Sequence, residues 1–500
     1  MSDAMALCDS ERSLGWAALD DALSRTANAL LARDLGPDHR VAVFADNAVE
    51  TVVAHLGGLL GGASTVPVNF HLTAPEVAYI LRDSGARLLF VGPETGERGI
   101  EAARLAGVEQ VVGWRTTLDG IEPWTDLLAG AAADQPPADI APRPNLLYTS
   151  GTTGTPKGTE LPPTMFAGGT TMADHIAAIR ASGFASFGTH LVVGPLYHTG
   201  PLSGARLLLA GIPLVVLGRF DPEATLAAIG THRVESSIMV PTHFVRLLAL
   251  PEEARRRYDT SSLRLVAHTG SACPLDVKQA MIEWWGPLFL EAYGASEVGT
   301  VCSITSPEWL EHRGSVGRPV PPFDAVVLDD DDQPVPAGVE GRLYFHDATG
   351  RGVVYHNDPE KSRAAHVAPG VFTLGEIGYV DRDGYVFITD RFSDMVVSGG
   401  VNIYPAESEQ VLITHPGVED VACIGVPHAE MGEQLLALVV PVDPSAPPDA
   451  EELLAWCRER LAHYKCPLAV EQVESIGRTA MGKLNKRQLR APYWEKETTG

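Results

Sequence analysis

Tyr148-Thr149-Ser150-Gly151-Thr152-Thr153-Gly154-Thr155-Pro156-Lys157-Gly158 carries more chemical information than any other stretch of this 500-residue sequence. It contains five Ser and Thr hydroxyls, three glycines and one lysine. Glycines let backbone N–H groups turn toward an anion, and hydroxyl and ammonium groups bind phosphate oxygens. The stretch follows the strand-like residues Leu146 and Leu147. We therefore expect a phosphate-binding loop that leaves the edge of a sheet.

This loop differs from a P-loop of the GxxxxGK[ST] type. Pro156 stands where that motif has its second glycine, and Gly158 replaces the hydroxyl residue after the lysine. Pro162 and Pro163 follow closely and disfavour the helix that a P-loop requires. The loop therefore indicates a different class of phosphate site.

Strand-like and helix-like segments alternate on both sides of the loop, over residues 40–300. We expect strands at 40–44, 64–68, 87–91, 213–217, 236–240, 263–268 and 287–293. We expect helices at 49–60, 74–82, 222–229 and 275–285. This alternation predicts parallel sheets that are covered by helices.

The pattern changes after residue 314. Short strands separated by turns predict an antiparallel β module over residues 315–391. A smaller α/β segment follows, with strands expected near 421–425 and 436–442 and its last helix near 451–461. The predicted fold class is therefore α/β: a large N-terminal region, residues 1–392, of two helix-covered sheets plus the β module, and a small mobile C-terminal α/β domain, residues 393–500.

Composition excludes several classes of protein. Lys and Arg number 38 and Asp and Glu number 63, a net charge of −25, which disfavours binding to nucleic acids. The six cysteines form no Cys-x-x-Cys pair, so neither a disulfide framework nor a structural zinc site is expected. The N-terminus lacks the pattern of a signal peptide, and the apolar stretch around 207–217 is too short to span a bilayer. We expect a cytoplasmic protein without stable membrane insertion.

The loop resembles the phosphate-binding signature of the adenylate-forming superfamily, which includes acyl-CoA synthetases, peptide-synthetase adenylation domains and luciferases. Four further segments resemble signatures of this superfamily, in the same order: Pro195-Leu196-Tyr197-His198, Tyr293-Gly294-Ala295-Ser296-Glu297, Gly375 to Gly384 with Asp390-Arg391, and Gly477 to Lys483. The resemblance covers nearly the whole chain and is closest to the acyl-CoA synthetases.

The resemblance implies a reaction in two steps. A carboxylic acid reacts with ATP to give acyl-AMP and pyrophosphate, and the acyl group then passes to CoA. The implied cofactors are ATP, Mg²⁺ and CoA, with the N-terminal domain binding ATP and the acid and the C-terminal domain moving between the steps. The implied ATP- and AMP-binding residues are Thr149, Ser150, Gly151, Thr152, Thr153, Gly154, Lys157, Gly270, Ser271, Ala272, Tyr293, Gly294, Ser296, Glu376 and Arg391.

The resemblance also implies individual roles. Lys483 is expected to be the cation that stabilises the adenylation transition state, and Glu297 to be the magnesium-associated carboxylate and a catalytic residue. His198 is expected to be a catalytic residue that screens the acyl site, although a buried histidine without a catalytic role stays an alternative. Tyr293 offers an aromatic face for adenine, with simple core packing as the alternative. The expected acyl pocket is formed by His198, Gly200, Thr242 and Gly270, and the expected CoA passage by Gly399 and Gly400.

Three positions depart from the usual pattern. Glu376 stands where the superfamily has the aspartate that accepts hydrogen bonds from the ribose, so the carboxylate lies one methylene further out. Ser393 stands at the hinge, where Asp or Lys is usual, and contributes no charge to either placement of the C-terminal domain. Ser296 replaces the usual threonine but keeps the hydroxyl, so a hydrogen bond to the α-phosphate of ATP is still expected there.

Three functions are compatible with these features. The favoured one is an acyl-CoA synthetase for a medium-to-large apolar acid, because Gly200, Ser203, Gly204 and Ala205 are small and leave room for a ligand. The second is an enzyme that passes acyl-AMP to a carrier protein or partner enzyme in trans. The third is a nucleotide-binding scaffold without activity, which would need neither Lys157 nor Lys483.

Overall fold

The structure is a computed structural model that describes residues 4–149, 156–162, 166, 169–271, 273, 275–329, 331–391, 395–477 and 486–495. The chain forms two compact units. The large unit contains residues Met1–Phe70, Ala74–Tyr148 and Gly158–Thr389. The small unit contains residues His71–Thr73, Thr149–Lys157 and Asp390–Gly500.

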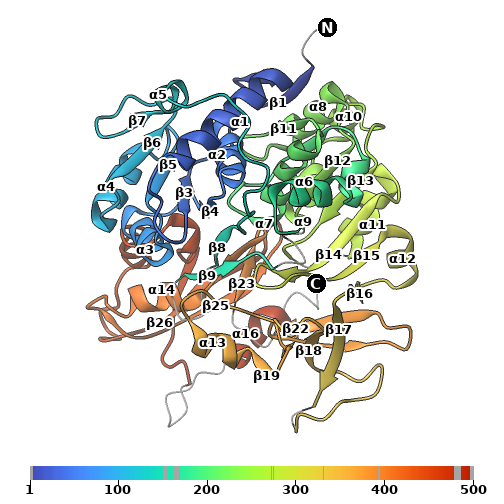
Figure 1. Cartoon of the computed structure of the whole chain (residues 1–500). Helices are drawn as coiled ribbons and strands as arrows, with labels where there is room; N and C mark the ends of the chain where they lie inside the picture. Colours follow the sequence, from blue (N-terminus) through green and yellow to red (C-terminus); the bar gives the residue numbers. More distant parts are fainter. Residues whose placement is uncertain are drawn as a thin grey trace. The chain divides into compact units, whose positions relative to one another are not determined.

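The first sheet of the large unit is parallel, with the strand order β4-β3-β5-β6-β7 (Figure 1). Its strands are β3 (Arg40–Phe44), β4 (Ser64–Val68), β5 (Leu88–Val91), β6 (Gln110–Gly113) and β7 (Glu122–Pro123). Its helices are α1 (Trp16–Leu31), α2 (Val49–Leu60), α3 (Ala74–Ser84), α4 (Gly96–Ala106) and α5 (Trp124–Ala129). Every residue of β3, β4 and β5 is buried, as expected for parallel strands covered on both faces.

The second sheet of the large unit has a parallel part. Its parallel strands are β1 (Met5–Cys8), β10 (His190–Val192), β11 (Leu214–Val216), β12 (Ser236–Met239), β13 (Leu265–His268) and β14 (Phe289–Ala295), with β2 (Ser13–Gly15) antiparallel to β1. Its helices are α6 (Met172–Arg180), η1 (Gly183–Ser186), α7 (Thr199–Ala205), η2 (Arg206–Ala210), α8 (Pro222–His232), α9 (Pro241–Leu248), α10 (Glu252–Arg256), α11 (Leu275–Trp285) and α12 (Ser306–Glu311). The parallel sheets expected from the alternating pattern are confirmed.

The antiparallel module continues this second sheet. Strand β14 pairs antiparallel with β15, and β15 with β16, so the module is joined to the parallel strands by backbone hydrogen bonds. The module contains β15 (Gly299–Thr305), β16 (Ser315–Pro319), β17 (Phe323–Leu328), β18 (Gly341–Asp347), β19 (His366–Ala368), β20 (Val371–Phe372), β21 (Glu376–Val380), β22 (Val386–Arg391) and α13 (Pro359–Ala364). Two further strands, β8 (Leu146–Thr149) and β9 (Lys157–Glu160), form a separate pair.

The small unit has one sheet that is buried on both faces. Its elements are β23 (Val396–Ser398), β24 (Val401–Ile403), α14 (Pro405–Leu412), β25 (Val418–His428), β26 (Gly432–Pro441), α15 (Ala450–Arg458), η3 (His463–Lys465), β27 (Ala469–Gln472) and α16 (Lys486–Glu495). Val421 and Cys423 of β25 pack in one core with residues of α14 and α15. Ala422 and Ile424 pack in another, which includes Leu489 of α16. Because side chains alternate along a strand, both faces of β25 need a cover.

The prediction of the last helix of the chain is wrong. The helix expected near 451–461 is α15, which ends at Arg458, and a further helix, α16, follows over Lys486–Glu495. Helix α16 carries an internal proline, Pro492, which disfavours helix formation locally. Its packing against β25 and β26 explains why it forms. Within the described residues, no helix combines the length and the apolar character needed to cross a membrane.

Candidate active site

The carboxyl ends of strands β12, β13 and β14 lie at one edge of the second sheet, because these strands are parallel. The register pairs Met239 with His268 and His268 with Glu291. Ligands of open α/β sheets bind at such edges. Three residues expected in the site follow these strands, Thr242, Gly270 and Ser271, and a fourth, Tyr293, lies two residues before the end of β14. Sheet geometry therefore brings them to the same edge.

Tyr293 and Glu376, two of the expected nucleotide-binding residues, are in direct contact. The Tyr293 hydroxyl donates a hydrogen bond of 2.9 Å to Oε2 of Glu376. Glu376 begins β21 and is only 8% exposed, and the ring of Tyr293 lies 5.9 Å from that of Phe345. A buried carboxylate needs hydrogen bonds, and the tyrosine supplies one. The contact fixes the direction of the longer side chain that replaces the usual aspartate.

Ser296 lies in the turn between β14 and β15. Its hydroxyl oxygen is 3.2 Å from that of Thr199, the first residue of α7. Just before the turn, Gly294 of β14 has to be glycine, because a Cβ at this position would lie 1.9 Å from the carbonyl oxygen of Gly299 at the start of β15. The Thr199–Ser296 contact connects the segment expected at the acyl pocket with the segment expected at the α-phosphate. No local sequence pattern indicates this contact.

Glu297 follows in the same turn, and Arg351 holds its backbone. Nη1 of Arg351 donates to the carbonyl oxygens of Glu297, at 3.1 Å, and Gly352, at 3.3 Å. Nη2 donates to the carbonyl oxygen of Glu160, which ends β9, at 3.3 Å. Arg351 thus joins the turn that carries Glu297 to the strand that follows the phosphate-binding loop. Arg351 was not among the residues predicted for the site, and its only local signal is its place between Gly350 and Gly352.

His198 directly precedes α7, and its ring centroid lies 4.4 Å from that of Tyr197. The residue is half-buried, and the loss of water around the imidazole lowers its pKa to about 4. Neutral imidazole is therefore the form present at pH 7. The neutral imidazole can donate a hydrogen bond to a carboxylate or accept one from a carboxylic acid, but it contributes no positive charge.

The small residues of α7 have a packing reason that the sequence analysis did not consider. A Cβ at Gly200 would lie 3.1 Å from Cγ2 of Ile238 in β12. A Cβ at Gly204 would lie 2.4 Å from Nε2 of His190 in β10. Glycine at these positions lets the helix approach the sheet, so their size is not by itself a sign of an acyl pocket.

The predicted phosphate-binding loop, residues 148–158, runs from the end of β8 into the start of β9. A strand after the loop, in place of a helix, agrees with the exclusion of a P-loop. Thr149 and Lys157 end and begin these strands and belong to the small unit. Several expected site residues lie outside the described residues: Ser150, Gly151, Thr152, Thr153, Gly154, Ala272, Ser393 and Lys483. The backbone of Arg391 is described as the end of β22.

The donors in the large unit fit a magnesium nucleotide. Toward a bound nucleotide, Tyr293 would offer an aromatic face, Glu376 a carboxylate acceptor for sugar hydroxyls, and Ser296 a hydroxyl donor. Glu297 carries a carboxylate, the hard oxygen ligand that Mg²⁺ prefers. Bound there, Mg²⁺ would neutralise charge on phosphate oxygens.

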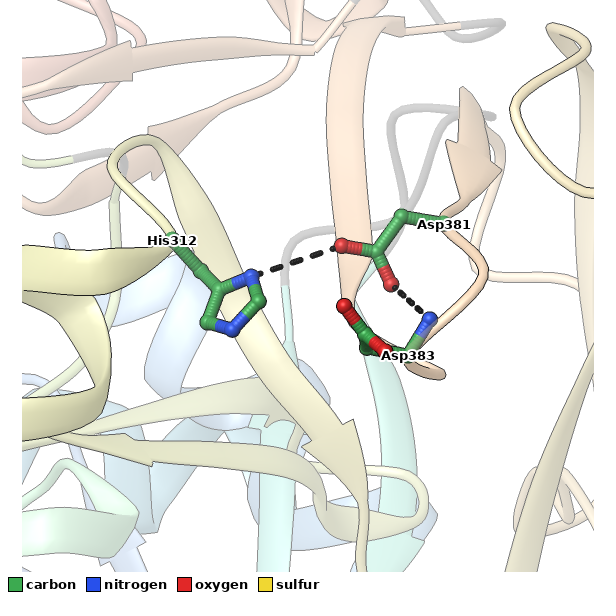
Figure 2. Close-up of side chains that lie close together, drawn as sticks. All are labelled: His312, Asp381 and Asp383. Atoms are coloured by element: carbon green, nitrogen blue, oxygen red, sulfur yellow. Dashed lines mark hydrogen bonds and ion pairs between the residues drawn. The ribbon is translucent and has the colours of Figure 1, made fainter.

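A second group of polar side chains lies in the module at His312, Asp381 and Asp383, whose possible ligand atoms are within 4.8 Å of one another. Figure 2 shows that Asp381 accepts from the backbone N–H of Asp383 and that Nδ1 of His312 points to Asp381, at 3.4 Å. His312 also stacks on Tyr385 with ring centroids 3.7 Å apart. These contacts explain the group as the packing of a turn.

Gly399 and Gly400 form the two-residue connection of the hairpin β23–β24 in the small unit. Their φ angles are +57° and +80°. A two-residue turn with positive φ at both positions strongly favours glycine. The turn therefore explains both residues, and a role in a CoA passage remains a prediction.

The helix after Lys483 is firmly attached to the sheet of the small unit. Lys486 Nζ lies 2.6 Å from Oε1 of Glu409, and Nη2 of Arg490 lies 3.0 Å from Oε1 of Glu433. Oε2 of the same Glu433 accepts from the backbone N–H of Val397, at 2.8 Å. These contacts anchor α16 three residues after Lys483 and connect it to the strand before Gly399.

Comparison with family models identifies the chain. Residues 1–353 match the model of the AMP-binding enzyme, and residues 407–483 match that of the AMP-binding enzyme C-terminal domain. The chain belongs to the AMP-binding enzyme family. This confirms the resemblance to adenylate-forming enzymes, and the family's enzymes use ATP and CoA.

Relatives within the AMP-binding enzymes differ in substrate and acceptor. The chain is 35% identical to a feruloyl-CoA synthase of Amycolatopsis sp, over 96% of this chain and 94% of the relative. It is 31% identical to the fatty acid–[acyl-carrier-protein] ligase ScoC of Streptomyces coeruleorubidus, over 98% of this chain and 93% of that one. The solved structure of the amide bond synthetase McbA from Marinactinospora thermotolerans is similar with a TM-score of 0.84 and 28% identity, covering 98% of this chain and 97% of that chain.

Proposed function

We propose that this protein activates a carboxylic acid with ATP and transfers the acyl group to CoA. In the first step a carboxylate oxygen attacks the α-phosphorus, the bond to the β-phosphate oxygen breaks, and pyrophosphate leaves. In the second step the CoA thiol loses its proton, its sulfur attacks the acyl carbon, and AMP leaves. The carrying observation is the contact between Tyr293 and Glu376 at the same sheet edge as the Ser296–Glu297 turn, in a chain of the AMP-binding family.

The chain supplies a group for each charge in the first step. On this proposal Lys157 and the loop hydroxyls bind phosphate oxygens, and Glu297 would hold Mg²⁺, which would neutralise phosphate charge. Lys483 stabilises the negative charge that rearranges between the carboxylate and the α-phosphate. His198, which is neutral at pH 7, forms a wall of the acyl site and contacts the acid without competing with Lys483 for charge.

The proposed substrate is an acid with a medium-to-large apolar body. The segments expected around the acid are apolar or neutral, and the similar feruloyl-CoA synthase is named for an acid with an aromatic body. The proposed acceptor is CoA, with Gly399 and Gly400 beside its pantetheine arm. The alternative acceptor is a carrier protein in trans, which is favoured by the similarity to ScoC, named as a ligase to an acyl carrier protein.

The decisive experiment measures ATP–pyrophosphate exchange with fatty, aromatic, steroidal and terpenoid acids, followed by addition of CoA or of a carrier protein. We expect at least one acid to support exchange and CoA to convert the adenylate to a thioester. Lys483→Ala should lower exchange by about 10²-fold or more, because a cation aimed at a transition state contributes several kcal/mol. Lys496→Ala, a second C-terminal lysine, serves as the matched control and should leave exchange unchanged.

Two results would overturn the proposal. If no acid supports exchange, or if Lys483→Ala exchanges as fast as the wild type, adenylation by this site is wrong. If acyl-AMP forms but only a carrier protein accepts the acyl group, the alternative replaces CoA. Ser393→Pro tests the second step separately. The rate of ATP–pyrophosphate exchange should stay within about 10-fold of the wild type, while thioester formation should be nearly abolished, because proline fixes φ near −65° at the expected hinge.

A further inference from the structure

Arg206 is a buried cation at the end of the segment expected at the acyl pocket. It is the first residue of η2, directly after α7, and is only 4% exposed. Its Nη2 donates to Oγ of Ser203 at 2.8 Å, and its guanidinium lies 5.4 Å from the ring centroid of Phe166. Its Nε has no hydrogen-bond partner. A neutral hydroxyl and an aromatic face are its neighbours.

No carboxylate of the described residues forms an ion pair with Arg206. The residues next to Phe166 that lie outside the described part, 163–165 and 167–168, are Pro, Thr, Met, Ala and Gly, so that segment has no acid to offer. The guanidinium therefore lacks the partner that buried charges in proteins normally have.

The charge is retained despite burial. Desolvation lowers the pKa of Arg206 to about 10, which still leaves the guanidinium protonated at pH 7. An uncompensated buried charge costs several kcal/mol, and an apolar residue of similar volume is often more stable in its place. A ligand that brings the counter-charge explains why a cation occupies this position.

The place of Arg206 defines where such a ligand group would lie. Thr199, at the start of α7, contacts Ser296 at the expected α-phosphate end of the site. Arg206 reaches back to Ser203, which is four residues after Thr199 and therefore about 6 Å further along the helix axis. The backbone of Arg206 itself is about 10 Å along this axis from Thr199. The guanidinium thus lies away from the reacting end, along the same helix.

We propose that Arg206 binds a second carboxylate of the acid substrate, at the end opposite to the carboxylate that is adenylated. This inference rests on the proposed function and narrows it to acids with an apolar body between two carboxylates, about 6 to 10 Å apart. The planar guanidinium offers parallel N–H donors that match a carboxylate. A monocarboxylic acid would leave this cation without a counter-charge.

The test compares matched pairs of acids in ATP–pyrophosphate exchange. The pairs are hexanoate and hexanedioate, octanoate and octanedioate, decanoate and decanedioate, and 3-phenylpropanoate and 3-(4-carboxyphenyl)propanoate. In at least one pair, the wild-type protein should use the diacid with a kcat/KM about 10-fold or more above that of the monoacid, because a site built for a polar group discriminates strongly. 7-Oxooctanoate, which ends in a neutral ketone, should not show this gain.

Variants then assign the preference to Arg206. Arg206→Met should lower kcat/KM for the preferred diacid by about 10²-fold and leave the monoacid of the same pair within about 3-fold. Arg206→Lys, which keeps the charge but loses the planar fork, should give an intermediate KM for the diacid. Arg180, at the exposed end of α6, provides the matched control. Arg180→Met should leave kcat/KM unchanged for both the diacid and the monoacid.

A stability measurement separates ligand binding from a structural role. Without substrate, Arg206→Met should unfold at the same temperature as the wild type or a few degrees higher, because it removes an unpaired buried charge. The preferred diacid should raise the unfolding temperature of the wild type but not that of the variant. A clearly lower unfolding temperature of Arg206→Met, in the absence of acid, would make Arg206 a structural residue and overturn the proposal.

The outcomes of exchange also distinguish this proposal from the proposed function. If monoacids support exchange, every pair is used equally, and Arg206→Met changes no ratio, the second-carboxylate site is wrong while adenylation stands. If 7-oxooctanoate gains as much as octanedioate, the group recognised is a neutral oxygen and the proposal is again wrong. If no acid supports exchange, the proposed function itself fails.

Discussion

Two buried cations of the large unit have opposite surroundings. Lys278, on α11, is 1% exposed, forms an ion pair with Glu291 of β14, and lies 4.7 Å from the ring centroid of Trp309. Arg206, on η2, is similarly buried but has a serine hydroxyl and a phenyl ring as neighbours. The first cation has its counter-charge inside the protein; the second does not.

This difference indicates how the role of a buried charged side chain can be inferred from its neighbours. A charge whose counter-charge is also buried connects two elements, here α11 and β14, and needs nothing from outside. A buried charge without a counter-charge is a cost to the folded protein, and a ligand of opposite charge can offset that cost. The same sequence therefore uses one cation for stability and the other, on our proposal, for recognition. Four predictions test or sharpen this comparison, in order of decreasing effect.

The largest expected effect is on stability at Lys278. Lys278→Met should lower the free energy of unfolding by about 3–5 kcal/mol, because it leaves the Glu291 carboxylate buried without its partner. Thermal and urea unfolding measure this loss. Replacing both partners, Lys278→Met with Glu291→Leu, should recover most of it.

The control for Lys278 is an ion pair on the surface. Arg256 pairs with Glu252 on α10, and the side chain of Arg256 is 79% exposed. Arg256→Met should change stability by less than about 1 kcal/mol. Two results would contradict the distinction between the two buried cations. Lys278→Met could lower the free energy of unfolding as little as Arg256→Met does, or Arg206→Met could lower it as much as Lys278→Met does.

The next effect concerns a buried carboxylate with a neutral partner. Tyr293→Phe removes the hydroxyl that orients Glu376 and should raise KM for ATP by about 10-fold or more, since a hydrogen bond to a charged group contributes about 1.5–3 kcal/mol. The discrimination between ATP and 2′-deoxy-ATP should fall as well, because the ribose acceptor is no longer held in place.

A matched tyrosine controls for the loss of a hydroxyl. Tyr258 also donates to a glutamate, Glu223, at 2.9 Å, but neither is an expected nucleotide-binding residue. Tyr258→Phe should leave KM for ATP unchanged. Equal effects of the two substitutions would remove Tyr293 and Glu376 from the nucleotide site.

The third prediction concerns buried bases that stay neutral. Burial lowers the pKa of His55 and of His190 to about 3, below the ordinary value of 6.5. Below pH 6.5 the unfolded chain binds more protons at these residues than the folded chain does. Each should therefore reduce stability by about 1.4 kcal/mol per pH unit from pH 6 toward pH 3, and the stability is fully present above pH 6.5.

Unfolding measured between pH 4.5 and 7.5 checks this slope. His55→Gln removes one titrating group, so the slope below pH 6 should decrease by about one proton. A slope that His55→Gln does not alter would contradict the neutral buried imidazole.

The smallest expected effect is at the hydroxyl pair of the site. Thr199→Val removes the contact with Ser296 and should lower kcat/KM for the acid by about 3- to 10-fold, the range of a neutral hydrogen bond. Thr199→Ser keeps a hydroxyl and should restore most of the rate in ATP–pyrophosphate exchange. Failure of the serine variant to restore it would mean that the methyl group, and not the hydroxyl, is important there.

Much of the fold was predictable because its signals are local. The buried strand β3 and the helix α2 follow from their apolar patterns, and the predicted parallel sheets depend on such alternation. Helix α16 was missed because its local signal is weak and includes Pro492, whereas the need for it lies in the second apolar face of β25. The requirement for α16 therefore comes from the apolar face of β25 and is only weakly visible in the sequence of α16 itself.

The sequence alone determined the family, the type of chemistry and most of the candidate residues, because the loop and the other signatures are contiguous stretches whose residue types carry the chemistry. Only the tertiary structure decided which of these side chains meet. Tyr293 and Glu376 are 83 residues apart and meet because their strands, β14 and β21, belong to the same sheet. Lys278 and Glu291 meet because α11 brings the lysine to β14. Whether a cation is buried, and whether a carboxylate lies beside it, depends on elements distant in the chain. For that reason Arg206 has no distinguishing mark in the sequence, and its unpaired charge becomes visible only in the folded protein.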